Sequence, residues 1–348
     1  MRCQNNKIEL RIAGPEDRDG IRKVFESGKF DGDFSIQFLR NPDPLTSMSH
    51  DGDRAVVIIM EYVETGEIAG VAACVIRREF VGSEMKRIGY LTGLKILPEY
   101  QKKVYCITDG YQFIRDITRE HVDLYYTTIL SSNTGAIKLL EKKHKNMPSY
   151  LYLGDYTTYC LKTGGMSRDR LTELKPEELK SLYSTELPKL DFAPADTDLF
   201  GLEEDDFYAL RGADGQILAA CAIYDQQEDK QYVVSGYGGK YKFLSKIPTR
   251  LLGYPRFPKA GSTLIYASVA FLYIKNADPK LGRRFIKAVA NYAKRYDLLL
   301  LGLFENNPNR ALFEKVKHVK FQSRLYEVAW EEPRYSPGNP IGLEVSLL

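Results

Sequence analysis

Apolar and polar residues alternate along the first half of the chain with the periods of both strands and helices. Two apolar runs flank the Glu64-Thr65-Gly66 turn and predict an antiparallel hairpin. Residues 101–121 carry apolar side chains on one stripe, which predicts an amphipathic helix. The predicted order is strand 8–12, helix 17–25, helix 36–40, strands 54–62, 68–77 and 86–97, helix 101–121, strand 124–130, helix 133–143, and a hairpin over 150–161 that turns at Gly154-Asp155.

The second half repeats this order in a looser form. Asp214-Gly215 is a strong turn signal between two apolar runs, as Thr65-Gly66 is in the first half. The predicted elements are a strand and helix over 171–183, strands 207–211, 216–224, 232–236 and 263–274, helix 281–296, strand 298–304, helix 309–317, strand 321–330, and a segment over 342–348 that could pair back as a last strand.

The two halves also share short stretches of sequence. Residues 65–74 and 214–221 both form a turn and an apolar strand that ends in cysteine, at an offset of 149 positions. Residues 133–142 resemble 307–315 at an offset of 173 positions. One insertion in the second copy explains the difference of 24 positions. A repeat of this length indicates a duplicated domain rather than a solenoid.

We therefore expect two domains in the 348-residue chain, over 1–163 and 166–348, joined at Gly164-Gly165. The stretch 240–261, rich in glycine, proline and lysine, is the expected place of the insertion. Each domain should be an α/β unit with a mixed, mostly antiparallel sheet, because hairpins flank a single strand-helix-strand crossover in each half.

Composition excludes several classes of protein. A formal net charge of +3 is too small to indicate a nucleic-acid or membrane partner. The five cysteines form no CxxC pair and the four histidines are dispersed, so we expect no metal site. Three features together predict a cytoplasmic protein: this cysteine usage, an N-terminus without an apolar signal core, and the lack of an apolar run of membrane-spanning length.

Three fragments, in this order along the first half, resemble the GNAT superfamily of N-acetyltransferases. They are Gly14-Pro15-Glu16-Asp17 after the first strand, Leu94-Lys95-Ile96-Leu97-Pro98-Glu99-Tyr100-Gln101 at the end of the fourth, and Asn133-x-x-Ala136-x-x-Leu139-x-Glu141-Lys142 on a helix. The chain looks like a tandem pair of such domains. The resemblance implies acetyl-CoA as the cofactor and a primary amine of a small molecule or peptide as the acceptor.

The resemblance also implies where acetyl-CoA binds. Backbone groups of two residues in the splayed fourth strand would pair with the pantetheine arm, and the loop before the next helix would present N–H groups to the pyrophosphate. The implied cofactor residues are Leu94, Ile96, Gln101, Lys102, Lys103, Val104, Tyr105, Cys106 and Asn133. Asn133 is equally well explained as the N-cap of its helix.

Both halves depart from the family's loop pattern. Val104 and Cys106 stand where the family has glycine and a small residue, and the β-branched side chain would crowd the phosphates. The second half keeps Gly282 but has Pro279 and Arg284 at the other two places. We expect the first half to bind the cofactor because its flanking motifs match better.

The acid and base of the reaction are not marked by the sequence. The tyrosine that many family members carry is replaced by Leu140 in the first half and Phe313 in the second. Tyr105 and Glu99 are the catalytic candidates. Packing explains Tyr105 as well, and a solvated position explains Glu99 as well.

Three functions fit these observations. The first is an N-acyltransferase with one active half, working as a monomer or homodimer. The second is a non-catalytic CoA- or ligand-binding regulatory protein on a degenerate fold, which the substitutions in the loop favour. The third is a tRNA-dependent aminoacyl transferase, which the small net charge disfavours.

Overall fold

The computed structural model describes residues 1, 3, 7–28, 34–101, 106–142, 145–239 and 241–348. The strands of the first half are β1 (Ile8–Ile12), β2 (Phe34–Leu39), β3 (Arg54–Tyr62), β4 (Glu67–Val81), β5 (Glu84–Ile96), β6 (Leu124–Leu130) and β7 (Ser149–Lys162). Its helices are α1 (Arg18–Glu26), α2 (Pro44–Ser49), α3 (Ile107–Thr118) and α4 (Thr134–Leu140), with 3-10 turns η1 (Pro15–Asp17) and η2 (Arg119–His121).

The second half contains the strands β8 (Thr172–Glu173), β9 (Phe207–Arg211), β10 (Ile217–Tyr224), β11 (Gln231–Tyr237), β12 (Tyr266–Ile274), β13 (Leu298–Phe304) and β14 (His318–Ala329). Its helices are α5 (Pro176–Glu186), α6 (Tyr241–Leu244), α7 (Pro279–Tyr292) and α8 (Arg310–Phe313). Its 3-10 turns are η3 (Leu187–Lys189), η4 (Glu204–Asp206), η5 (Thr249–Leu252), η6 (Lys275–Ala277) and η7 (Val345–Leu347).

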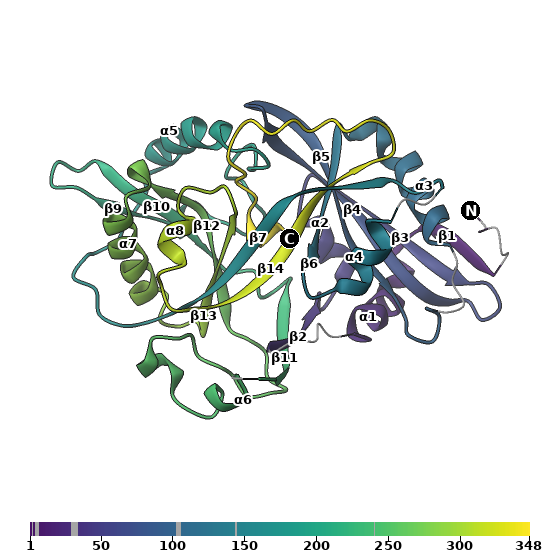
Figure 1. Cartoon of the computed structure of the whole chain (residues 1–348), viewed down its shortest axis with the longest axis horizontal. Helices are drawn as coiled ribbons and strands as arrows, with labels where there is room; N and C mark the ends of the chain where they lie inside the picture. The colour runs from purple at the N-terminus through teal and green to yellow at the C-terminus, as the bar shows by residue number, and fades with distance from the viewer. Residues whose placement is uncertain (2, 4–6, 29–33, 102–105, 143–144, 240) are drawn as a thin grey trace.

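One 12-stranded sheet runs through the molecule, and helices lie on both of its faces (Figure 1). The strand order is β1-β3-β4-β5-β6-β14-β7-β13-β12-β10-β9-β8. The crossovers β5-α3-β6 and β12-α7-β13 give parallel pairs, and the other described pairs are antiparallel. The predicted mixed α/β class, with one crossover in each half, is confirmed.

The two halves exchange their last strands at the middle of the sheet. β7 of the first half pairs with β13, and β14 of the second half pairs with β6. β7 and β14 also pair with each other along most of their length. The exchange makes one continuous sheet, so each half is completed by a strand from the other.

The predicted hairpin over 150–161 is wrong, because this segment is the single strand β7. Gly154, at a φ of +146°, marks a register shift against β14 rather than a chain reversal. The Phe304 ring and the Glu305 carboxylate lie where a Cβ on Gly154 would stand, and Glu305 Oε2 accepts a hydrogen bond from Asp155 N at 3.0 Å. Partners on distant strands therefore keep the chain extended through a glycine that locally resembles a turn.

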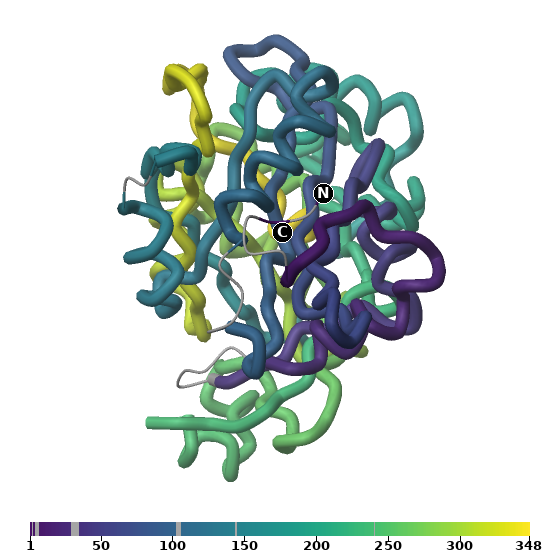
Figure 2. The backbone as a smooth tube through the Cα atoms, turned by 90° about the vertical axis from the view of Figure 1, so that its right-hand side faces the viewer, coloured from purple at the N-terminus to yellow at the C-terminus, as the bar shows by residue number. Residues whose placement is uncertain are grey.

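The helix predicted over 36–40 is also wrong. β2 occupies this segment and pairs with β11 in a separate two-stranded sheet, which Figures 1 and 2 both place at the margin of the molecule. Nearly two hundred residues separate the paired strands, so the local sequence pattern carries little sign of the pairing. The predicted last strand over 342–348 is wrong as well, since its final residues form η7.

Helices pack on opposite faces of each half-sheet. In the first half, Ile21 and Val24 of α1 pack against one face, and Ile114 of α3 packs against the other. In the second half, α5 takes the place of α1 through Tyr183, and α7 takes the place of the crossover helix α3 through Phe285. Within the described ranges, no helix combines the length and apolar character needed to cross a membrane.

Candidate active site

The parallel strands β5 and β6 pair over three residues and then separate. Ile88 to Tyr90 pair with Leu124 to Tyr126, while β5 continues to Ile96 and β6 to Leu130. The two strands beyond these pairs form an opening in the sheet, which we call the first opening. The sequence prediction of splayed strands at this place is therefore confirmed in the geometry of the backbone.

A β-bulge lies at the edge of the first opening. Thr92 pairs with Ala73 and Lys95 with Val71, so Gly93 and Leu94 together oppose one residue of β4. Gly93 has a φ of +68°, a conformation that glycine adopts without a steric penalty. The Leu94 side chain is 43% exposed. The end of the pairing with β6 and the bulge against β4 place Leu94 at the first opening, and its contact with a cofactor stays a prediction.

The other predicted residues of this strand and loop are placed less simply. Gln101 donates a hydrogen bond from Nε2 to the Ile96 carbonyl at 3.3 Å, so a ligand must compete for that oxygen. Glu99 is exposed in the turn after β5. The predicted loop residues Lys102, Lys103, Val104 and Tyr105 lie outside the described residues.

Cys106 and Asn133 both stand at helix N-termini. Cys106 is the N-cap residue of α3, makes no hydrogen bond as a side-chain cap, and is buried. Its thiol lies against Cys3, and this contact, together with burial, raises the pKa of Cys3. Asn133 Oδ1 accepts a hydrogen bond from Ala136 N at 3.2 Å, so the side chain caps α4. Its role toward the cofactor stays a prediction.

A buried polar cluster lies on the sheet face opposite α3, beside the paired part of β5 and β6. Arg77 donates from Nε to Glu79 Oε1 at 3.0 Å and from Nη2 to the Tyr126 hydroxyl at 2.5 Å. Tyr126 in turn donates to Glu79 Oε1 at 3.2 Å. The Tyr90 hydroxyl lies 3.0 Å from Thr128 Oγ1, at the point where β5 and β6 separate. The cluster therefore extends from the closed part of the sheet to the start of the opening.

No sequence motif marks this cluster. Its one sequence signal is the interruption of an apolar strand by Arg77 and Glu79, which share a face with buried Val75. Burial raises the pKa of the Glu79 carboxyl to about 7, although the neighbouring Arg77 guanidinium opposes this shift. The side chain therefore changes charge near neutral pH.

A second buried group of charges adjoins the cluster. Asp51 accepts from Arg40 at 2.6 Å and pairs with the Lys230 ammonium at 2.7 Å. Burial lowers the pKa of Lys230 to about 8. Arg77 Nη1 donates to the Leu347 carbonyl at 2.6 Å, and Lys230 donates to the Ser346 carbonyl. Charged side chains from both halves therefore hold the last residues of the chain at the centre of the molecule (Figure 1).

The second half contains a matching opening, which we call the second opening. Tyr266 to Ser268 of β12 pair with Leu298 to Leu300 of β13, and a bulge follows at Phe271 and Leu272. The bulge starts three residues after the last parallel pair in both halves. The same backbone geometry therefore occurs twice.

The chain itself fills the second opening. Phe271 N donates to Glu344 Oε1 at 2.9 Å, and the Phe271 carbonyl accepts from the Tyr183 hydroxyl at 2.7 Å. η7 lies against β12 and β13, and a Cβ on Gly302 would stand 2.8 Å from Val345 Cβ. The bulge groups that a ligand would use are thus taken by side chains of the protein itself.

The chain itself also occupies the N-terminus of the helix that follows the second opening. Asp278 Oδ1 accepts from Lys280 N at 2.7 Å and Leu281 N at 3.3 Å, so a carboxylate occupies the N-terminus of α7. A carboxylate there repels a phosphate. Gly282 serves helix packing, because an added Cβ would stand 2.3 Å from Leu312 Cδ2. The glycine that matches the family's loop pattern in this half is therefore explained by packing.

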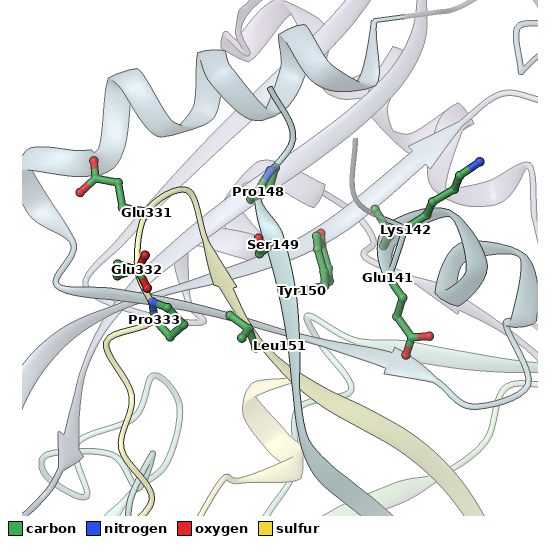
Figure 3. Close-up of a pocket in the computed structure, with 10 residues that line it drawn as sticks. Glu141, Lys142, Pro148, Ser149, Tyr150, Leu151, Glu331, Glu332 and Pro333 are labelled. Atoms are coloured by element: carbon green, nitrogen blue, oxygen red, sulfur yellow. The ribbon is translucent and has the colours of Figure 1, made fainter. Parts of the chain in front are cut away.

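A cavity of about 320 Å³ lies elsewhere, between the start of β7, the end of α4 and the loop after β14. Figure 3 shows Ser149 and Tyr150 of β7 between Glu331 on one side and Glu141 on the other. No predicted cofactor residue that the structure describes lines this cavity. Its position does not coincide with either opening.

Comparison with known proteins shows the fold. No protein-family model matches the chain, and no curated protein matches it. Saccharomyces cerevisiae N-myristoyltransferase with bound myristoyl-CoA matches with a TM-score of 0.58 and 10% identity, over 99% of this chain and 85% of the enzyme. A GCN5-related N-acetyltransferase from Sphaerobacter thermophilus matches with a TM-score of 0.50 and 10% identity, over 97% and 99% of the two chains.

A third match is the GCN5-related glucosamine N-acetyltransferase region of a fungal multi-domain GH3 beta-N-acetylglucosaminidase. It has a TM-score of 0.54 and 13% identity, over 92% of this chain and 38% of that one. The three matches each extend over both halves of the present chain. The chain therefore has the GNAT fold, as the three sequence fragments predicted.

Proposed function

We propose that this protein transfers an acyl group from an acyl-CoA thioester to a primary amine and that its first half binds the acyl-CoA. The difference between the two openings carries the proposal. In the first, the bulge at Gly93 and Leu94 is partly exposed. In the second, Glu344 occupies the bulge and Asp278 occupies the helix N-terminus.

The residues of the first half suit a ligand with an extended amide arm and a polyphosphate. The backbone around Leu94 would pair with the arm as a further strand would. Gln101, Lys102 and Lys103, which the resemblance assigns to the cofactor loop, would bind the phosphates before the start of α3. Bound acyl-CoA supplies an activated thioester carbonyl.

The amine would enter from the face opposite α3. The hydroxyls of Tyr90 and Thr128 stand on this side, where β5 and β6 separate, and can orient an amine by hydrogen bonding. Tyr105 and Glu99 stay the candidates for proton transfer that the sequence indicates. We propose an acetyl group as the acyl group and a small molecule or peptide as the amine acceptor.

Calorimetric titration tests the binding step. CoA, acetyl-CoA and myristoyl-CoA are titrated into the full chain, since fold neighbours include proteins named for each acyl group. We expect all three to bind at micromolar concentration, with acetyl-CoA as the acyl donor that turns over. Preference for myristoyl-CoA in both binding and turnover would contradict the proposed acetyl group.

Matched variants locate the site. The first combines Gln101→Ala, Lys102→Ala and Lys103→Ala, and the second combines Lys275→Ala and Lys280→Ala in the corresponding segment of the second half. We expect the first variant to lose about tenfold or more in CoA affinity and the second to bind as the wild type does. The reverse result would place the site in the second half.

Release of free CoA thiol with a panel of amines tests transfer. Release of CoA that depends on the added amine would support the proposed acyltransferase activity. Binding without release for any amine of the panel would instead support the regulatory alternative, which the valine at 104 favours.

A further inference from the structure

A second cavity, of about 180 Å³, lies on the sheet face opposite α3. Three segments that are distant in sequence enclose it: the turn after α2 (Ser49 to Asp53), the end of β4 (Arg77 to Glu79) and the loop over 194–200. Leu347 lines it as well. We call it the Glu79 pocket. It lies beside the closed part of the sheet, since Glu79 pairs with Lys86 of β5 and β5 separates from β6 only after Tyr90.

Glu79 has one unused oxygen. Its side chain is buried, and Oε1 accepts hydrogen bonds from Arg77 and Tyr126. In the part of the chain that the structure describes, no donor approaches Oε2. Once Glu79 is ionised, above its pKa of about 7, a buried carboxylate oxygen without a donor is costly, so this atom then calls for a partner with N–H groups.

The rest of the pocket carries more carboxylates than guanidiniums. Arg78 faces Asp53 at 3.1 Å and Asp196 at 3.6 Å, and both carboxylates are about half exposed at the mouth. Asp198 also acts on Arg78 and lines the pocket. At the mouth, one guanidinium therefore faces three carboxylates. Deeper in the pocket the charges are paired, Arg77 with Glu79, and Arg40 and Lys230 with Asp51, so the excess of carboxylates lies at the mouth. This balance attracts a cation and repels an anion.

An aromatic wall completes the pocket. The His50 ring stacks on the Phe200 ring with centroids 3.3 Å apart and an interplanar angle of 11°. His50 Nδ1 lies 2.7 Å from Asp229 Oδ2, which fixes the orientation of the ring. Phe200 is 56% exposed and lines the cavity. An exposed aromatic face beside carboxylates suits an organic ammonium ion, which gains from both.

We propose that the Glu79 pocket binds a small alkylammonium ion. Its ammonium group would displace the atoms that cover Glu79 Oε2 and donate a hydrogen bond to this oxygen, while Phe200 packs on its carbon chain. At about 180 Å³ the pocket is many times larger than the space that one water molecule needs, so it has room for a small organic ion. The site is separate from the proposed acyl-CoA site, and the inference does not rest on acyl transfer. Arg77 and Tyr126 connect Glu79 to the start of the first opening.

Titration of propylammonium chloride into the full chain at pH 8 tests the proposal, with n-propanol as the neutral analogue. We expect saturable binding of the ammonium and none of the alcohol. Glu79→Gln keeps the shape of the side chain but removes its charge, and we expect it to weaken binding about tenfold. Glu344→Gln is the matched control, because it neutralises another buried carboxylate in the second opening, and we expect wild-type affinity.

Phe200→Ala provides a second test that does not disturb the buried cluster. Its side chain is exposed, so the variant should fold, and we expect affinity to fall several-fold. Three results would overturn the proposal. They are equal affinity of wild type and Glu79→Gln for propylammonium, binding of n-propanol as tight as that of propylammonium, and displacement of propylammonium by Mg²⁺ but not by other amines. CoA titrations of the same variants should be unchanged, so failure of acyl-CoA binding and failure of the ammonium site are distinguishable.

Discussion

Glu344 shows how one residue can remove a site that the fold would otherwise provide. It satisfies the bulge amide of the second opening, and burial raises the pKa of its carboxyl to about 7. In the unfolded chain a glutamate ionises near pH 4.3. Between these two values the folded state keeps a proton that the unfolded state has released. Stability therefore falls as pH rises through this window.

The variant Glu344→Gln tests this effect. The amide oxygen of glutamine can still accept from Phe271 N, and the side chain carries no charge. We expect the free energy of unfolding to fall less between pH 5 and 7.5 in the variant, by about 2 kcal/mol. Urea unfolding at the two pH values measures the difference. The pKa of Glu79 is also raised, so the stability of the variant should still fall with pH to some extent. If stability falls equally with pH in the wild type and in Glu344→Gln, Glu344 does not have the raised pKa.

Gly93 is the corresponding residue of the first opening. An alanine at its φ of +68° would adopt a left-handed conformation, although Phe25 leaves room for the Cβ at 3.5 Å. We expect Gly93→Ala to cost about 1 kcal/mol and to lower CoA affinity, because the bulge would shift. Gly110→Ala in α3 is the control, since nothing lies within 4 Å of its Cβ and alanine favours a helix. Chemical denaturation and CoA titration measure both variants.

At the scale of elements, α7 shows why a motif glycine need not mark a phosphate site. Gly282→Ala would push a Cβ against Leu312 and Ile274, the latter at 3.0 Å. We expect a loss of about 1–3 kcal/mol in stability from overpacking and no change in CoA affinity. A fall in affinity at unchanged stability, measured by calorimetry and denaturation, would return the second half to consideration as a binding site.

The sequence predicted most elements whose partners are local. The hairpin of β3 and β4 follows from a glycine turn between apolar runs, and the crossover through α3 follows from its amphipathic stripe. The errors fall where distant segments decide: β2 pairs with β11, and β7 stays extended because β13 and β14 flank it. The local sequence pattern of such a strand does not show that its partners lie in the other half of the chain.

The same reason limits what could be predicted of the site. The residues Leu94 and Gln101 are predicted because a family motif runs through them, and the structure places both at the first opening or its adjoining turn. Their role toward a cofactor stays a prediction. Glu79 belongs to no motif. Its neighbours Asp51, Asp196 and Leu347 come from separate parts of the chain. Only the fold brings them together.

At the scale of the whole molecule, the exchanged strands couple the two halves. β14 lies between β6 and β7 in the sheet, so a fragment of residues 1–163 would lack the strand that joins its β6 to its β7. We expect fragments 1–163 and 166–348 to aggregate when produced separately and to form a stable complex when produced together. Gel filtration and circular dichroism test this. A separately folded, monomeric 1–163 fragment would show that the exchange is dispensable.

The exchange also sets an order on folding during synthesis. A nascent chain leaves the ribosome from its N-terminus, and β6 emerges almost two hundred residues before β14, its neighbour in the finished sheet. Through that interval β6 presents an unpaired edge, the kind of surface on which sheets of separate chains join. In that interval, β6 of one nascent chain could pair with β14 of a neighbouring chain on the same messenger. A slow stretch of codons in the second half would lengthen the interval and favour interlinked chains over chains that complete their own sheet.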